Sequence, residues 1–241
     1  MSFKKFAKSL IKTLALVALV ITVSLETPHL YKGYMRNIAE ENVVRIVGIN
    51  GMGTGFHVQI EGKTYLLTNK HVCNMAGPLK VEKYGAKEGI VRKVIKRSNK
   101  HDLCIMEALP GVEGIRIGSD AENGDTVYTL GHPRGDALNV ASGEKFDDKD
   151  IHIGEEVSED GTCAEGVLTE YPTFFGVLSI CDVTRNTIQI SSPTYPGNSG
   201  SPLVNKWGNL VGVIFAGSRE VENMGFAVPL SFVKEFLSSV K

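Results

Sequence analysis

The stretch Gly197-Asn198-Ser199-Gly200-Ser201-Pro202 places a serine between glycines, just ahead of the apolar residues 203–204. Flanking glycines allow a tight turn that exposes the serine hydroxyl and lets the backbone approach a substrate carbonyl closely. On such a turn the N–H groups of Gly197 and Ser199 can converge on one point and stabilise an oxyanion there. Because a serine hydroxyl alone is a poor nucleophile, this hypothesis requires a histidine base and an orienting acid elsewhere in the chain.

Both partners are found upstream, each at the edge of an apolar strand. Residues 65–73 (YLLTNKHVC) read as a strand that ends at His71, and residues 101–106 (HDLCIM) place Asp102 at the mouth of a second strand. The chain order is therefore His71, Asp102, Ser199. Three motifs in this order are far more specific than any one of them alone.

Other residues compete for the same roles. Each of the three side chains could instead be an ordinary turn or strand-end residue, and His101 is the main rival histidine because it adjoins Asp102. Asp120 and Asp125 are the alternative acids, but neither begins an uninterrupted apolar strand. We therefore predict His71 as base, Asp102 as orienter and Ser199 as nucleophile.

Several segments carry a resemblance to a known family. They are residues 54–56 (TGF), 67–72 (LTNKHV), 101–103 (HDL), 131–135 (GHPRG), 197–203 (GNSGSPL), 212–217 (GVIFAG) and 224–229 (MGFAVP). They resemble the chymotrypsin-fold (trypsin-like) serine proteases, most of all the bacterial branch of HtrA/Deg proteases and V8-type glutamyl endopeptidases, over about residues 42–238. The resemblance implies a serine endopeptidase that forms an acyl-enzyme through the His71, Asp102 and Ser199 triad, with Gly197 and Ser199 as the oxyanion hole. HtrA/Deg proteins usually add a C-terminal PDZ domain, and none is expected here.

Short runs with alternating polarity, separated by turn signals, favour closed antiparallel β-structure. We expect an all-β fold of two six-stranded barrels, at about residues 42–110 and 113–228, followed by a C-terminal helix at about 229–240. Residues 61–62 (EG) suit a tight hairpin turn, while residues 175–180 and 187–191 read as separate strands. The acidic segment 136–166 reads as a solvated surface loop, with a calcium site or an acidic exosite as the alternative.

The N-terminus differs from the rest of the chain. Four lysines precede an uncharged apolar run at residues 13–25, as in a signal peptide or a short signal-anchor helix over residues 1–25. We therefore expect a protein exported across the cytoplasmic membrane, where it is anchored, periplasmic or secreted. Residues 26–41 are expected to form a stalk, and the resemblance makes a trimer a possible assembly.

Composition limits the remaining functions. A formal net charge of −1 gives no electrostatic reason to expect a nucleic-acid partner. No metal site and no cofactor are expected, because no CxxC or HxxxH spacing occurs. Four cysteines (Cys73, Cys104, Cys163 and Cys181) permit disulfides in an exported chain without specifying their pairing, and Cys104, in an apolar strand, reads more simply as a buried thiol.

The expected partners are protein or peptide substrates. By the resemblance, the substrate pocket has Pro193 at its floor, with walls formed by Ile214, Phe215 and Ala216 and by Gly225 and Ala227. With no aspartate at Pro193 and no histidine at Ile214, the pocket favours small or medium apolar residues over basic or acidic ones. The alternative function is a non-catalytic peptide-binding module on the same scaffold.

Overall fold

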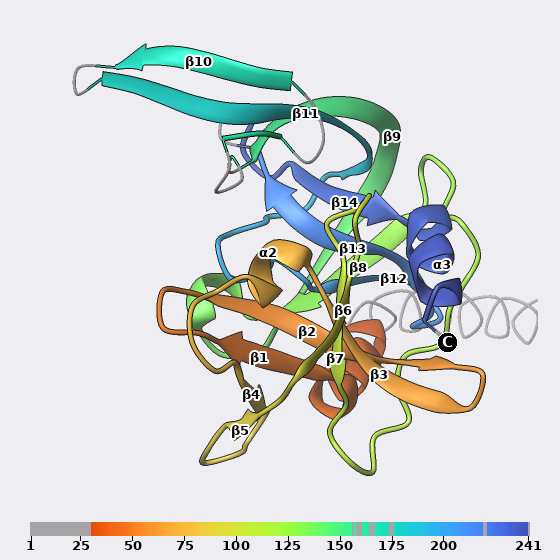
Figure 1. Ribbon diagram of the computed structural model, residues 1–241. Coiled ribbons are helices and arrows are strands. Elements are labelled where there is room, and N and C mark those ends of the chain that lie inside the picture. The colour runs from red at the N-terminus through yellow and green to blue at the C-terminus, as the bar shows by residue number, and fades with distance from the viewer. Residues whose placement is uncertain are drawn as a thin grey trace, which may run out of the picture.

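The structure, a computed structural model, describes residues 30–155, 157, 161–163, 167–173, 176–218 and 221–240. About half of these residues lie in two antiparallel β-sheets, and Figure 1 shows one sheet above the other. The expected signal or anchor segment at residues 1–25 lies outside the described residues. Within the part that the structure describes, no helix is long and apolar enough to cross a membrane.

The first sheet has the order β5-β4-β1-β2-β3-β7-β6. Its central hairpin joins β2 and β3 through the predicted turn, where Ile60 lies opposite Lys63 and both Glu61 (φ 47°) and Gly62 (φ 79°) have positive φ. Positive φ at both turn residues, as in a type I′ turn, gives the turn a backbone twist that matches the right-handed twist of β2 and β3. The strands are β1 Val43–Val47, β2 Met52–Ile60, β3 Lys63–Thr68, β4 Lys80–Lys83, β5 Ile90–Val91, β6 Val94–Arg97 and β7 Cys104–Glu107.

The second sheet has the order β10-β11-β14-β13-β12-β8-β9 and closes on itself because β9 also pairs with β11. Six strands thus form a barrel, and β10 extends β11 as a hairpin arm that projects away from the body (Figure 1). The strands are β8 Thr126–Gly131, β9 Asn139–Glu155, β10 Val167–Thr173, β11 Gly176–Ile190, β12 Pro202–Asn205, β13 Leu210–Gly217 and β14 Gly225–Pro229. The predicted chymotrypsin-like all-β fold is confirmed, and the second sheet contains the expected six-stranded barrel, whereas the first sheet has seven described strands where six were expected.

The expectation of a loop at residues 136–166 is wrong for its first half, because β9 occupies Asn139–Glu155. In this strand Ile151 and Ile153 pack against the core, while His152 between them is exposed. This alternation of apolar and polar residues covers only a few positions, and the residues around it in the sequence are mostly acidic. The two strands expected at 175–180 and 187–191 are one continuous strand, β11. Among the described residues, no three acidic, histidine or cysteine side chains converge as a metal site would need.

Two segments tie the sheets into one body. Residues 30–42, most of the expected stalk, form a helix whose Met35 and Ala39 are fully buried in the main apolar cluster. Between the sheets, Ile115 pairs with β2 and Ile117 pairs with β13. The predicted C-terminal helix is α3 Leu230–Ser238, and it buries the four apolar residues spaced for that purpose, Leu230, Val233, Phe236 and Leu237.

The four cysteines form two disulfides, Cys73–Cys104 and Cys163–Cys181. The interpretation of Cys104 as a free buried thiol is therefore wrong, although its side chain is fully buried. Cys104 lies opposite Thr68 at the end of β3, and the helical turn α2 (Lys70–Cys73) that follows β3 folds back over this pair. Cys73 and Cys104 are brought together by this packing of α2, which no local sequence pattern indicates.

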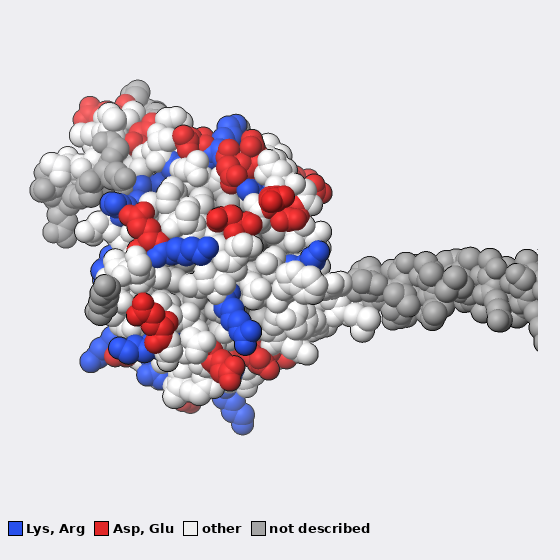
Figure 2. All heavy atoms as spheres, turned by 90° about the vertical axis from the view of Figure 1, so that its right-hand side faces the viewer, with Lys and Arg blue, Asp and Glu red and all other residues white. Residues whose placement is uncertain are grey.

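On the face that carries α3, the charged side chains are not gathered by sign, and Figure 2 shows acidic and basic residues interspersed there. One partly covered pair is Lys145 and Asp148 on β9, whose side chains approach within 2.8 Å while the lysine also donates to the carbonyl of Ala121. Single surface pairs of this kind contribute little to stability.

A buried histidine on β2 connects the residue before β1 with the segment that follows β7. His57 on β2 is fully buried; its Nδ1 lies 2.9 Å from the carbonyl of Asn42, and its Nε2 lies 3.1 Å from the N–H of Leu109. Because the Leu109 N–H must donate, Nε2 is the acceptor and Nδ1 carries the proton. Burial lowers the pKa of His57 below its usual range, since the charged ring loses its hydration. The folded protein therefore holds this ring neutral.

We expect the free energy of unfolding to fall as the pH drops below about 6.5, the usual histidine pKa. In that range His57 binds a proton in the unfolded chain but not in the folded protein. Its contribution to the free energy of unfolding is therefore present above this pH and lost below it, by at most about 1.4 kcal/mol per pH unit. Urea unfolding between pH 7.5 and 5 measures this slope. His57→Gln should be less stable at pH 7.5 but show a shallower slope, and an unchanged slope would contradict the assignment.

Candidate active site

The register of the first sheet brings His71 and Asp102 together. Strand β3 ends at Thr68 opposite Cys104 at the start of β7, so the residues just beyond each strand end are neighbours. Asn69 is the N-cap of α2, and its side-chain amide donates to the carbonyl of Asp102 at 2.8 Å. Figure 1 shows α2 between the two sheets, on the side of β2 and β3 that faces the second sheet.

The Asp102 carboxylate accepts two hydrogen bonds from His71. Its Oδ2 lies 2.7 Å from the ring Nδ1, and its Oδ1 accepts the backbone N–H of His71 at 3.0 Å. A carboxylate accepts, so Nδ1 carries the ring proton and Nε2 keeps its lone pair. The His71 side chain is 51% exposed and that of Asp102 only 19%. The imidazole is therefore held at one end and accessible at the other, as a proton-accepting base requires.

The turn that carries Ser199 is held beside α2 by Thr54 of β2. The N–H of Thr54 donates to the carbonyl of Ser199 at 2.8 Å, and its hydroxyl donates to the carbonyl of Gly197 at 2.7 Å. A Cβ built on the neighbouring Gly53 would lie 2.7 Å from the Val72 side chain and 3.2 Å from the carbonyl of Ser199. Only a glycine at position 53 lets the serine turn and α2 approach β2 this closely.

The Ser199 hydroxyl donates to the carbonyl of Phe215 at 3.2 Å. Within the described residues no hydrogen bond joins it to His71. The structure thus brings His71 and Asp102 into direct contact and places Ser199 on an adjacent loop, with its hydroxyl directed at β13.

The N–H groups of Gly197 and Ser199 are free in the described part of the chain, where neither donates to a backbone or side-chain acceptor. Gly197 has a φ of 95°, and the following N–H, of Asn198, closes a turn onto the carbonyl of Tyr195 at 3.0 Å. A Cβ at Gly197 would lie 2.4 Å from the carbonyl of His132, so the loop at 132–135 packs directly against this turn. Two unused donors on a supported turn are the arrangement that an oxyanion site requires.

The residues expected around a substrate pocket are brought together at β13 and β14. Ile214 lies opposite Ala227, and both are fully buried in an apolar cluster, so they lie beneath the surface rather than along an open wall. Phe215 is nearly buried, whereas Ala216 and Pro193 are partly exposed, and Gly225 faces Gly217 across the pair of strands.

Two contributors to the site were missed by sequence reasoning. A Cβ at Gly217 would lie 2.5 Å from the carbonyl of Thr194, and one at Gly225 would lie 2.3 Å from its hydroxyl, so Thr194 fills the space between the two strands. Thr54, which holds the serine turn, lies in the TGF motif, but the motif did not reveal what its hydroxyl binds. The role of Thr54 depends on a partner 143 residues away.

We expect Gly200→Ala to destabilise the protein by about 3 kcal/mol or more, because a Cβ there would lie 2.0 Å from the carbonyl of Thr54 and 2.2 Å from the Thr68 hydroxyl, at a φ of 86°. Gly62→Ala is the matched control, since Gly62 has a similar φ of 79° but no atom within 4 Å, and should cost about 1 kcal/mol. Thermal unfolding followed by circular dichroism measures both. Equal losses would show that backbone strain, and not the close packing of the serine turn, sets the cost.

Comparison with known proteins agrees with this geometry. The chain is 28% identical over 193 residues to a serine protease Do-like HtrA of Bacillus subtilis and 28% identical over 203 residues to a serine protease HtrA-like protein of Staphylococcus aureus. These matches cover 77% and 79% of this chain but only 38% and 23% of the relatives, so the chain spans well under half of their length.

Solved structures share the fold. The active form of the Rv3671c protease of M. tuberculosis superposes with a TM-score of 0.65 at 22% identity, covering 88% of this chain and 86% of that one. The HtrA-type protease AlgW with a tripeptide gives 0.65 at 22% identity, over 87% and 63%. A family model described as the trypsin-like peptidase domain matches residues 53–213, which include His71, Asp102 and Ser199. With about two thirds of its length in that match, the chain belongs to the trypsin-like peptidase domain family.

Proposed function

We propose that this protein is a serine endopeptidase that hydrolyses peptide bonds with Ser199 as nucleophile, His71 as general base and Asp102 as its orienting acid. The observation that carries the proposal is the 2.7 Å hydrogen bond between His71 and Asp102, next to a serine turn with two unused N–H donors. The Ser199 hydroxyl must turn from the carbonyl of Phe215 toward His71. Catalytic hydrogen bonds are often long or misaligned in the free enzyme and tighten when substrate binds.

In the proposed reaction, Nε2 of His71 takes the Ser199 proton as the hydroxyl oxygen attacks the substrate carbonyl. Asp102 holds Nδ1–H and stabilises the imidazolium that forms. The N–H groups of Gly197 and Ser199 bind the developing oxyanion, and one such donor typically lowers the barrier by about 3 kcal/mol. His71 then protonates the leaving amine, and a water molecule, activated in the same way, releases the acyl group from Ser199.

Labelling with a fluorophosphonate probe tests this function directly, because such probes react with an activated serine and not with an ordinary one. Intact-mass measurement should show one added label on the wild-type protein and none on Ser199→Ala. If the folded wild-type protein gains no label that depends on Ser199, the alternative holds, namely a binding module that retains the protease scaffold.

The proposed substrates are proteins or peptides with a small or medium apolar residue before the cleaved bond. Pro193 supplies no charge, and Thr194 occupies space between Gly217 and Gly225, which leaves little depth for a long side chain. Cleavage of a peptide library, read by mass spectrometry, tests this preference. Strong cleavage after glutamate, lysine or arginine would contradict it.

We also propose that the protein is exported, through the lysine-flanked apolar run at residues 13–25, and is either cleaved or retained as a membrane anchor. Its two disulfides suit an oxidising compartment. A trimer, if it forms, follows by analogy with HtrA/Deg proteins. Intact mass and fractionation of the expressed protein distinguish cleavage from anchoring, and a catalytic domain found only in the cytosol would contradict both.

A further inference from the structure

The Cys73–Cys104 disulfide lies two residues beyond each member of the His71–Asp102 pair. Cys73 is the last residue of α2 and Cys104 the first of β7, and both side chains are buried. The bond therefore joins the two backbone segments that carry the base and its orienting acid. The apolar residues around it, among them Leu66, Val72 and Met106, belong to one buried cluster.

The segment that carries His71 has little stability of its own. Helix α2 has only four residues, and isolated helices of that length do not persist in water. The N-cap residue Asn69 makes no capping bond with its side chain, which is directed at the carbonyl of Asp102 instead. The position of α2 must therefore be set by contacts outside the helix.

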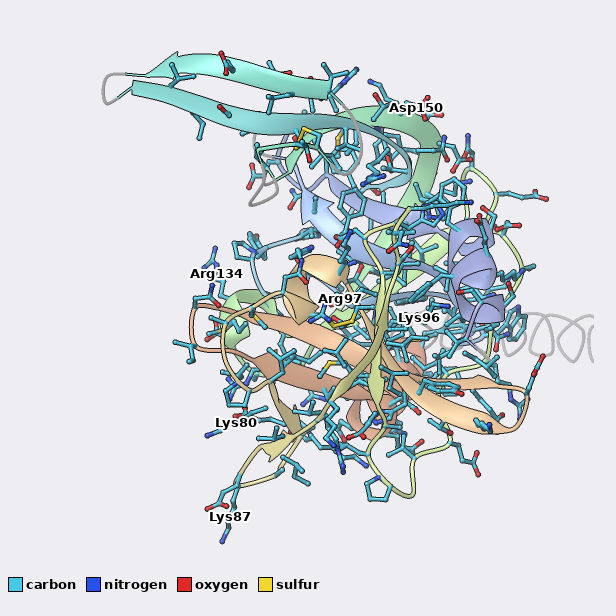
Figure 3. The ribbon with its side chains drawn as sticks, viewed as in Figure 1. Lys80, Lys87, Lys96, Arg97, Arg134 and Asp150 are labelled. Carbon is cyan, nitrogen blue, oxygen red and sulfur yellow. A yellow bond between two sulfur atoms is a disulfide. The ribbon has the colours of Figure 1, made fainter. Side chains whose placement is uncertain are left out.

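The hydrogen bond between His71 and Asp102 is too exposed to provide that restraint. The His71 side chain is half exposed, so water competes with Asp102 for the ring, and ion pairs with an exposed partner add little to stability. At the other end of α2, Arg97 of β6 donates to the carbonyl of Cys73 and to the Asn74 side chain, both at 2.9 Å, and Figure 3 shows Arg97 beside α2. The disulfide is the covalent member of this set of restraints.

We propose that the Cys73–Cys104 disulfide is a positioning element that keeps the imidazole of His71 aligned on Asp102. Its catalytic consequence rests on the endopeptidase function proposed above, while its effect on the pair itself does not. When the bond is broken, α2 can move relative to β7, and the exposed hydrogen bond cannot hold the ring in place. Misplacement of a catalytic group by about 1 Å can lower the rate about 100-fold.

The test compares Cys73→Ala/Cys104→Ala with Cys163→Ala/Cys181→Ala. The control pair removes the other disulfide, which ties β11 of the second sheet and closes a loop of 18 residues against 31. The chain-entropy model gives comparable stabilisation for loops of these lengths, so the two double variants are matched in that respect. Circular dichroism verifies that both are folded at the assay temperature. We expect the first pair to lower kcat about 10- to 100-fold with little change in KM, and the control to leave kcat unchanged.

A second readout does not depend on catalysis. In ¹⁵N-histidine-labelled protein, the Nδ1–H proton of His71 bonded to Asp102 should give a downfield NMR resonance, assigned by its loss in Asp102→Asn. It should broaden or disappear in Cys73→Ala/Cys104→Ala and persist in the control. In Cys163→Ala/Cys181→Ala the remaining disulfide is Cys73–Cys104. Long incubation of that variant with dithiothreitol, which supplies two electrons and two protons to the disulfide and becomes a cyclic disulfide, should also broaden or remove the resonance, and reoxidation should restore it.

Equal losses of kcat in the two double variants, or an unchanged resonance and kcat in Cys73→Ala/Cys104→Ala, would overturn the proposal. If that variant is unfolded, the reversible reduction of Cys163→Ala/Cys181→Ala decides in its place. A wild-type protein without Ser199-dependent labelling would contradict the endopeptidase function alone, because the resonance still reports whether the disulfide aligns His71 on Asp102.

Discussion

Ser199→Ala is expected to lower peptide hydrolysis by at least about 10⁴-fold while leaving the fold intact. The substitution removes the only atom proposed to attack the carbonyl, and the remaining rate comes from the oxyanion donors and substrate binding alone. Within the described part of the chain the hydroxyl makes one hydrogen bond, to the carbonyl of Phe215, so its loss should cost little stability. Hydrolysis of fluorescently labelled casein, together with a thermal melt, measures both effects.

Ser201→Ala is the matched control for this experiment. It lies two residues further along the same stretch, and its buried hydroxyl has no hydrogen-bond partner in the described part of the structure. Casein hydrolysis should therefore stay within about two-fold of wild type, since no partner loses a bond. Comparable activity of Ser199→Ala and the wild-type protein would contradict the nucleophile assignment, and an equal loss in Ser201→Ala would show that the turn, and not its hydroxyl, is what matters.

Asp102→Asn is expected to reduce kcat about 10³- to 10⁴-fold, with a smaller change in KM. The carboxylate accepts both the ring and the backbone N–H of His71, at 2.7 and 3.0 Å. An amide nitrogen facing Nδ1 would donate instead of accept. The ring proton would then move to Nε2, where the ring could no longer take the Ser199 proton. The same casein assay, with the substrate concentration varied, separates kcat from KM.

Asp125→Asn is the control, because Asp125 was the rival acid in the sequence. Its Oδ2 accepts the backbone N–H of Glu122 at 2.9 Å, an interaction that an asparagine oxygen can replace. Activity should be close to that of the wild-type protein. A loss in Asp125→Asn that matches the loss in Asp102→Asn would mean that the fall reflects damage to the fold rather than the orientation of His71.

Much of the fold could be predicted because its signals are local. The turn at Glu61 and Gly62 and the apolar spacing of Leu230, Val233, Phe236 and Leu237 each act within a few residues. The strand β9 shows the limit of such signals. Its charged side chains resemble those of a surface loop, but its backbone pairs with β8 on one side and β11 on the other. Hydrogen bonds to distant strands decided its structure, and local composition does not reveal them.

The sequence by itself determined the family and the order of its three motifs, because glycines, strand ends and apolar runs impose their conformations locally. Only the tertiary structure decided that β3 and β7 pair so that His71 meets Asp102, that Cys73 bonds to Cys104, and that Ser199 directs its hydroxyl at Phe215. The three side-chain contacts join residues between 16 and 31 positions apart, and the β3–β7 pairing joins residues 36 to 42 positions apart. Their geometry follows from strand register and the packing of whole sheets, which are global properties of the folded chain.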